Sequence, residues 1–137
     1  MAYWLMKSEP SAWSWDQQVA KGAKGEAWTG VRNHTAKLNM MKMKKGDLAF
    51  FYHSNDGKEI VGIVDIIREH YPDPSDKTGK FVCVDIKADK PLKKPVTLVA
   101  IKAEKALANM DLLKQSRLSV GSVKPDQWRI ICELAGI

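Results

Sequence analysis

The chain has 137 residues, of which 45% are hydrophobic and 28% are charged. This length suits one domain with a substantial core, and the composition excludes an intrinsically disordered chain, so we expect a single domain over residues 1–137. The 22 Lys and Arg exceed the 16 Asp and Glu and give a net charge of +6. That excess suits a polyanionic partner such as nucleic acid, although lysines that merely face water would also produce it.

The first third of the chain predicts short strands and helices. Ser14 stands three residues before Gln17, a capping-box pattern in which each side chain bonds the other residue's backbone N–H. The pattern predicts a helix that begins at Trp15 and ends before Gly22. The expected elements are a strand over residues 3–6, a helix over 15–21, a strand over 26–29 and a helix over 32–43.

The strongest β pattern lies in the middle of the chain. Residues 55–58 (NDGK) form a hairpin-turn signal between an aromatic segment and a β-branched one. Gly62 inside the second segment predicts a bulge or a close approach of another group. Val82, Val84 and Ile86 alternate with less apolar residues and predict a strand with one core face. The expected strands are residues 48–53, 60–67, 81–87 and 95–98.

The last third predicts helices around one extended segment. Pro125 suits the first turn of a helix and Gly136 suits its end, so a final helix is expected over residues 126–134. Before it, we expect helical turns over 102–107 and 110–113 and an extended segment over 118–123. About five short strands, with helices early and late, predict an α+β fold: a curved mixed sheet or small barrel flanked by helices.

The sequence also excludes several classes of protein. Cys83 and Cys132 are far apart and form neither a zinc nor a disulfide pattern, so both are expected to be buried or half-buried free thiols. No signal peptide and no apolar run of about 20 residues is visible. We therefore expect a cytoplasmic protein with no membrane partner.

Patterns of catalytic residues are missing as well. His34, His53 and His70 have no metal-ligand spacing. The chain contains no nucleophile elbow, phosphate-binding loop or dinucleotide-binding glycine pattern. We therefore expect no catalytic residues, no metal, no cofactor and no enzymatic activity.

Tryptophans and polar segments favour a binding site instead. Trp28 precedes a polar stretch broken by Gly30 and could stack on a planar ligand, whereas Asn33 there could simply cap the next helix. Three further tryptophans, Trp13, Trp15 and Trp128, are expected in the core because they lie in or beside amphipathic helices. Polar segments also end other elements, near residues 7–10, 52–54 and 115–119, a pattern typical of a concave site on a scaffold.

These segments closely resemble the signature blocks of EVE-domain proteins. The blocks are residues 3–10 (YWLMKSEP), 28–33 (WTGVRN), 51–54 (FYHS) and 115–120 (QSRLSV). The resemblance extends from Ala2 to Gly136. It implies a PUA-like fold related to ASCH and YTH domains, namely a small curved mixed β-barrel of five to six strands with flanking helices. It also implies a pocket for a modified base, such as methylated or hydroxymethylated cytosine in DNA, or a modified RNA base.

The resemblance further implies which residues line that pocket. Trp28 and Tyr52 would stack on the base, Leu118 would close an apolar wall, and a buried Glu9 would accept from an exocyclic amine. Lys7, Arg32 and Arg117 would bind phosphate. The implied set is Lys7, Ser8, Glu9, Trp28, Val31, Arg32, Asn33, Tyr52, His53, Ser54, Arg117, Leu118 and Ser119.

The function expected from the sequence is therefore a non-catalytic module that binds nucleic acid at a modified base. Two alternatives stay open. One is a regulatory domain that binds a free nucleotide or another small planar anion, and the other is an enzyme that acts on nucleic acid. The sequence leaves open which modification is read, whether DNA or RNA carries it, and the oligomeric state.

Overall fold

The computed structural model describes every residue from Met1 to Ile137. Its strands are β1 (Tyr3–Ser8), β2 (Glu26–Ala27), β3 (Leu48–His53), β4 (Glu59–Pro72), β5 (Val82–Thr97) and β6 (Val120–Val123). Its helices are α1 (Trp15–Ala20), α2 (His34–Lys42), α3 (Leu98–Ala103), α4 (Asp111–Lys114) and α5 (Pro125–Leu134), with 3-10 turns η1 (Gly22–Lys24) and η2 (Lys105–Leu107).

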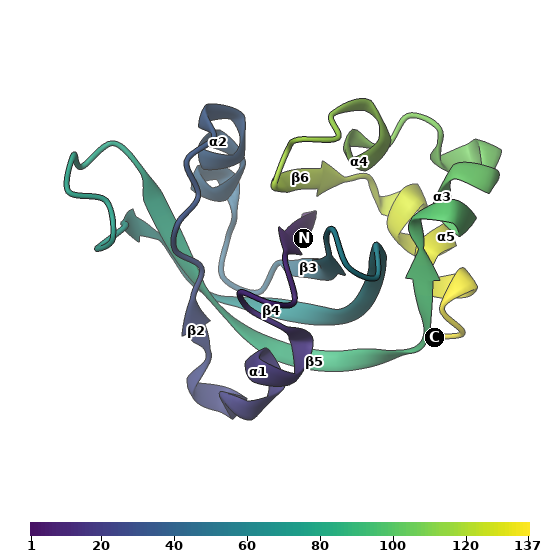
Figure 1. The fold of residues 1–137 in the computed structure, drawn as a ribbon, viewed down its shortest axis with the longest axis horizontal. Coiled ribbons are helices and arrows are strands. Elements are labelled where there is room, and N and C mark those ends of the chain that lie inside the picture. Colours follow the sequence, from purple (N-terminus) through teal and green to yellow (C-terminus); the bar gives the residue numbers. More distant parts are fainter.

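All six strands belong to one curved mixed sheet, in the order β2-β5-β4-β3-β1-β6. β1 and β3 are parallel, and the other neighbours are antiparallel. The α+β class and the number of strands are as predicted. The predicted barrel is not closed, because β2 and β6 are opposite edges of the sheet and do not pair. Figure 1 shows α3, α4 and α5 grouped at one end of this sheet, with α1 and β2 at the other.

The sheet has an apolar cluster on each face because neighbouring strand residues point to opposite sides. On β3, Phe51 belongs to one cluster, which also contains Trp28 and α2 residues. Its neighbours Phe50 and Tyr52 belong to the other cluster, which contains Trp128 and apolar residues of α3 and α5. The candidate site lies on the Trp28 side.

Local sequence signals set several helix ends as predicted. Ser14 and Gln17 form the capping box before α1. Pro125 occupies the first turn of α5. Asn33 caps α2, its Oδ1 accepting from the backbone N–H of Ala36 at 2.9 Å. The cap on α2 is the simpler of the two roles considered for Asn33, and it leaves the Asn33 amide nitrogen free.

The region after Phe81 departs from the prediction. The two strands expected over residues 81–87 and 95–98 are one long strand, β5, which contains Pro91 and Pro95. A strand tolerates proline where its ladder is irregular. Here the pairing shifts between Ile60 and Gly62 of β4, so that Val61 faces the segment 92–95 of β5.

The prediction of one helix over residues 102–107 is also wrong. α3 begins at Leu98, where the sequence predicts a strand, because the Thr97 hydroxyl caps the helix by accepting from the N–H of Ala100 at 3.1 Å. A separate turn, η2, follows, and Glu104 caps it. β2 and β6 are also shorter than the extended segments that were expected.

Cys83 is buried, Cys132 is half-buried, and both are free thiols, as predicted. No helix is both long and apolar enough to cross a membrane.

The close approach predicted at Gly62 is made by α1. The ring of Trp15 lies against Gly62 so tightly that a Cβ atom there would overlap the indole. Trp15 also packs edge-on to Phe51, with ring centroids 5.5 Å apart. Gly62 thus lets α1 dock on the sheet beside the candidate site.

We predict that Gly62→Ala destabilises the protein by about 1–3 kcal/mol, the usual cost of overpacking a core. Urea unfolding measures this change. Gly121→Ala is a matched control, since Gly121 also lies in a strand with ordinary φ and its added Cβ would come no closer than 3.3 Å, to Asp111 Cβ. Equal destabilisation of the two variants would contradict the proposed docking constraint.

Candidate functional site

Three of the four polar blocks meet at the C-terminal end of β1. β1 runs between β3 and β6. On one side the Ser54 N–H donates to the Ser8 carbonyl at 2.9 Å. On the other side the Lys7 N–H donates to the Ser119 carbonyl at 2.8 Å. Sheet pairing thus brings together segments that are more than 100 residues apart in sequence, as the numbering of Lys7 and Ser119 shows.

The fourth block, residues 28–33, is held differently. The Trp28 N–H donates to the Val84 carbonyl of β5 at 2.7 Å. The chain then leaves the sheet at Gly30, whose φ of +85° favours glycine. There the buried carboxylate of Asp73 accepts from the Gly30 N–H at 2.9 Å and from Arg32 Nη1 at 3.2 Å.

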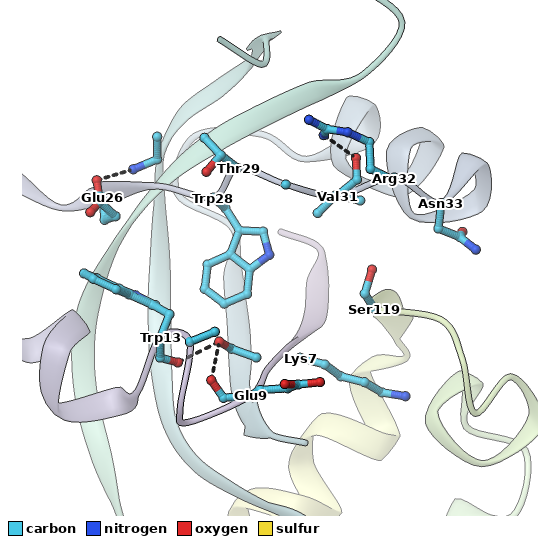
Figure 2. A pocket seen from close by; sticks show the side chains of 14 residues that line it. Lys7, Glu9, Trp13, Glu26, Trp28, Thr29, Val31, Arg32, Asn33 and Ser119 are labelled. Carbon is cyan, nitrogen blue, oxygen red and sulfur yellow. Dashed lines mark hydrogen bonds between the residues drawn. The ribbon is translucent and has the colours of Figure 1, made fainter. Parts of the chain in front are cut away.

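Between these segments lies a pocket of about 530 Å³, which we call the Trp28 pocket (Figure 2). This volume is within the range of small-molecule and base-binding cavities. Figure 2 shows the Trp28 indole projecting into the pocket, Trp13 along one side, and Lys7, Ser119 and Asn33 towards the other. The lining residues are Lys7, Ser8, Glu9, Ala12, Trp13, Glu26, Ala27, Trp28, Thr29, Gly30, Val31, Arg32, Asn33 and Ser119.

Trp28 belongs both to the core and to the pocket. Only 8% of the residue is exposed, and its ring packs edge-on to Phe51 with centroids 5.6 Å apart. Its indole N–H makes no hydrogen bond within the chain and still reaches accessible space. Trp28 therefore offers a ligand a fixed aromatic surface and one free donor.

The chain is similar over nearly its whole length to known proteins. The EVE domain family model matches residues 2–134. The chain belongs to the EVE-domain family. The NMR structure of Rpa0253 from Rhodopseudomonas palustris is 70% identical, with a TM-score of 0.94 over 99% of this chain and 94% of that one. Human THYN1 protein, crystallised in complex with DNA containing 5-methylcytosine, is 31% identical, with a TM-score of 0.91 over 100% and 99% of the chains.

The fold extends beyond this family. The YTH domain of Zygosaccharomyces rouxii MRB1 protein superposes with a TM-score of 0.60 over 99% of this chain and 85% of that one, at 15% identity. At that identity the likeness concerns the fold alone. It agrees with the PUA-like fold expected from the sequence.

The Trp28 pocket contains some of the residues expected from the sequence. Eight of the expected residues line it: Lys7, Ser8, Glu9, Trp28, Val31, Arg32, Asn33 and Ser119. Glu9 was expected to be buried but is exposed, and its Oε1 accepts from Asn55 Nδ2 at 2.6 Å. Arg32 is occupied by Asp73 and Ser75, which weakens its expected role in binding phosphate.

Five expected residues lie outside the Trp28 pocket. Tyr52 is in the core cluster on the opposite face of the sheet. His53 accepts from the Trp15 N–H at 3.0 Å through Nε2, and burial lowers its pKa, which favours this neutral acceptor form. Ser54 and Arg117 line smaller depressions nearby, and Leu118 is a buried member of the Trp28-side core.

Some residues of the site were not predicted from the sequence. Trp13 was assigned to the core, but it is half-buried at the pocket wall, where Ser8 Oγ donates to its carbonyl at 2.6 Å and Gln18 accepts from its indole at 2.9 Å. Thr29 and Glu26 line the pocket as well. Proximity to Trp28 in sequence was the one available signal for the last two.

The free polar groups decide what the pocket can bind. Most polar side chains expected to read a ligand already serve the fold, as for Ser8 and Arg32. The side-chain hydroxyls of Thr29 and Ser119 and the amide nitrogen of Asn33 make no hydrogen bond within the chain. Lys7 is half-buried, burial lowers its pKa, and its Nζ donates to the Ser116 carbonyl at 2.9 Å.

Asp73 positions the pocket wall although it does not line the pocket. Burial alone raises the pKa of its carboxyl, but hydrogen bonds from Ser75, Gly30 and Arg32 outweigh burial and hold the pKa below its ordinary value of 3.8. Because the pKa of Asp73 is lower in the folded state than its ordinary value, the ionised carboxylate stabilises the fold above about pH 3.8. This contribution disappears as the pH falls through the lower, folded-state pKa.

We predict that Asp73→Ala destabilises the EVE domain by about 1–3 kcal/mol, since it leaves donors without their acceptor. Hydrogen exchange at the Gly30 amide should also speed up. Asp76→Ala is the control: the Asp76 carboxylate lies in the same loop and accepts from Thr78, Lys80 and Phe81, but it forms no hydrogen bond with residues 28–33. Unchanged exchange at Gly30 in Asp73→Ala would contradict the positioning role.

Proposed function

We propose that this EVE domain is a non-catalytic reader that binds a modified nucleobase of DNA or RNA in the Trp28 pocket. The observation that carries the proposal is the pocket itself, in which a fixed indole and a half-buried second indole border free hydrogen-bonding groups. Aromatic surfaces bind the faces of bases, with about 1–3 kcal/mol per stacked base. Free donors and acceptors bind the polar edge of a base.

Charge in the pocket supports a base rather than an anion as its occupant. Lys7 and Arg32 are balanced there by Glu9 and Glu26. Arg32 is further paired with Asp73, and Glu26 lies 3.5 Å from the Lys21 ammonium. A neutral heterocycle suits such surroundings, whereas a phosphate would meet two carboxylates.

The apolar wall suits a methyl substituent. Val31 is buried, and it borders the pocket together with Ala12 and Ala27. The likeness to human THYN1, crystallised with DNA containing 5-methylcytosine, makes that base the first probe. A pyrimidine methyl gains about 25 cal/mol per Å² of apolar surface that it buries.

Binding of a free nucleotide or a similar planar molecule is the second candidate function. The pocket volume of about 530 Å³ accommodates the base of a free nucleotide as well as a strand-borne base, and the carboxylates of Glu9 and Glu26 would keep its phosphate outside the pocket. The two candidates differ in what they require around the pocket, because only a strand carries further phosphates that need binding sites outside it.

The test is a binding panel measured by fluorescence anisotropy. Single-stranded and duplex oligonucleotides of DNA and RNA carry cytosine, 5-methylcytosine or 5-hydroxymethylcytosine at one position. We expect at least one modified base to bind about tenfold more tightly than cytosine, and single strands to bind better than duplexes because flipping costs a few kcal/mol. Equal binding across the panel would overturn the proposal.

Variants connect that preference to the pocket. Trp28→Phe keeps a ring against Phe51 and removes the free indole N–H, and Ser119→Ala removes a free hydroxyl. Each should weaken binding about 2- to 12-fold, the value of one hydrogen bond. Trp128→Phe is the matched control, because Trp128 is also 8% exposed but lies across the sheet. Weakening in the control alone would place the site elsewhere.

A further inference from the structure

Two smaller depressions adjoin the Trp28 pocket. The first, of about 300 Å³, is lined by Lys114, Arg117 and their neighbours, and we call it the Arg117 depression. The second, of about 190 Å³, is lined by Lys58, Asn55 and Ser54 among others, and we call it the Lys58 depression. Binding of a base in the Trp28 pocket uses neither of them.

The three hollows form a continuous surface. Asn33 lines both the Trp28 pocket and the Arg117 depression. Lys7 lines both the Trp28 pocket and the Lys58 depression, and Ser116 lines both depressions. The hydrogen bond from Lys7 Nζ to the Ser116 carbonyl therefore stands where the three meet.

The two depressions differ from the Trp28 pocket in charge. Lys114 and Arg117 line one, Lys7 and Lys58 line the other, and neither contains an Asp or Glu. None of these four cations forms an ion pair with a carboxylate, whereas Lys21, Arg32, Lys44 and Arg129 elsewhere do. Unpaired cations grouped without acids produce the positive potential that attracts phosphate.

The turn between the depressions adds backbone donors. The Leu118 N–H donates to the Gln115 carbonyl at 2.9 Å and closes a turn whose central residues are Ser116 and Arg117. The backbone N–H groups of these two exposed residues make no hydrogen bond within the chain. Exposed backbone N–H groups beside Arg and Lys are frequent ligands of nucleic-acid phosphates.

We propose that the Arg117 and Lys58 depressions bind phosphates of one nucleic-acid strand, which crosses the turn at Ser116 and Arg117 while one of its bases occupies the Trp28 pocket. This inference rests on the proposed function of that pocket. It assigns phosphate binding to Lys114, Arg117 and Lys58, and it makes a strand a better ligand than a free nucleotide.

The experiment compares ligands of different length at different salt concentrations. Its probes are 5-methyl-dCMP, a single-stranded DNA of about five nucleotides with a central 5-methylcytosine, the same DNA with cytosine, and the RNA equivalents. Affinity is measured from about 50 to 200 mM NaCl. The variants are Lys114→Ala/Arg117→Ala and Lys58→Ala. The control Lys93→Ala/Lys94→Ala removes two exposed charges from β5, outside all three hollows.

We expect the wild-type strand to bind more tightly than 5-methyl-dCMP. Lys114→Ala/Arg117→Ala should reduce the slope of log K against log[NaCl] by about 0.7 for each phosphate that the variant no longer neutralises, and should reduce the advantage of the strand. Lys58→Ala should do the same to a smaller extent, and the control should leave the slope unchanged. The ratio of affinities for 5-methylcytosine and cytosine should persist, and the DNA and RNA arms show which sugar is preferred.

Two results would overturn the inference. One is a salt slope in Lys114→Ala/Arg117→Ala that equals the wild-type slope or falls no further than in the control. The other is a strand that binds no better than 5-methyl-dCMP. If the wild-type protein shows no preference for 5-methylcytosine over cytosine, but the variants still reduce the salt slope, the result would count against the proposed function of the Trp28 pocket. The assignment of the phosphate sites would be unaffected.

Discussion

The placement of β1 between β3 and β6 is the constraint on which the rest of the site depends. The parallel pairing with β3 sets Lys7 beside Tyr52, and the N–H of Lys7 is bonded to the Ser119 carbonyl that precedes β6. A one-residue slip in either pairing would exchange the faces of the strand, moving Met6 out of the core. Because a buried face fixes the register so strongly, the polar ends of the strands meet without a contribution from ligand.

The wall formed by residues 28–33 depends on a different force. It has almost no sheet pairing of its own, and a buried carboxylate at Asp73 holds it by accepting from Gly30 and Arg32. Trp28 in turn fills space against Phe51. One side of the pocket is thus fixed by strand pairing and the other by a charge-assisted loop contact, so the cavity exists before any ligand binds. Such preorganisation lowers the entropic cost of binding.

Prediction from the sequence succeeded where the deciding contacts are local. The capping box at Ser14 and the proline that begins α5 act over a few residues, and the family blocks carried the order of the site segments. It failed where contacts are distant. Asp73 shows no more than a loop pattern in the sequence, since the two pocket-wall residues that it binds, Gly30 and Arg32, lie about 40 residues away. The family resemblance implies Tyr52 in the pocket, although strand alternation puts it on the opposite face of the sheet from Phe51. Trp13 reaches the pocket through a turn, which the periodicity of helices and strands does not describe.

The tryptophans themselves can report whether a base occupies the Trp28 pocket. In protein labelled with ¹⁵N at tryptophan, each of the five indole N–H groups gives its own NMR signal. On titration with a single-stranded oligonucleotide containing 5-methylcytosine, we predict large shifts for Trp28 and Trp13. Trp128 in the opposite core, and Trp4, whose indole is bonded to Asp47 at 3.1 Å, should hardly move. Saturable binding that leaves the Trp28 and Trp13 signals in place would show that the base binds outside the Trp28 pocket.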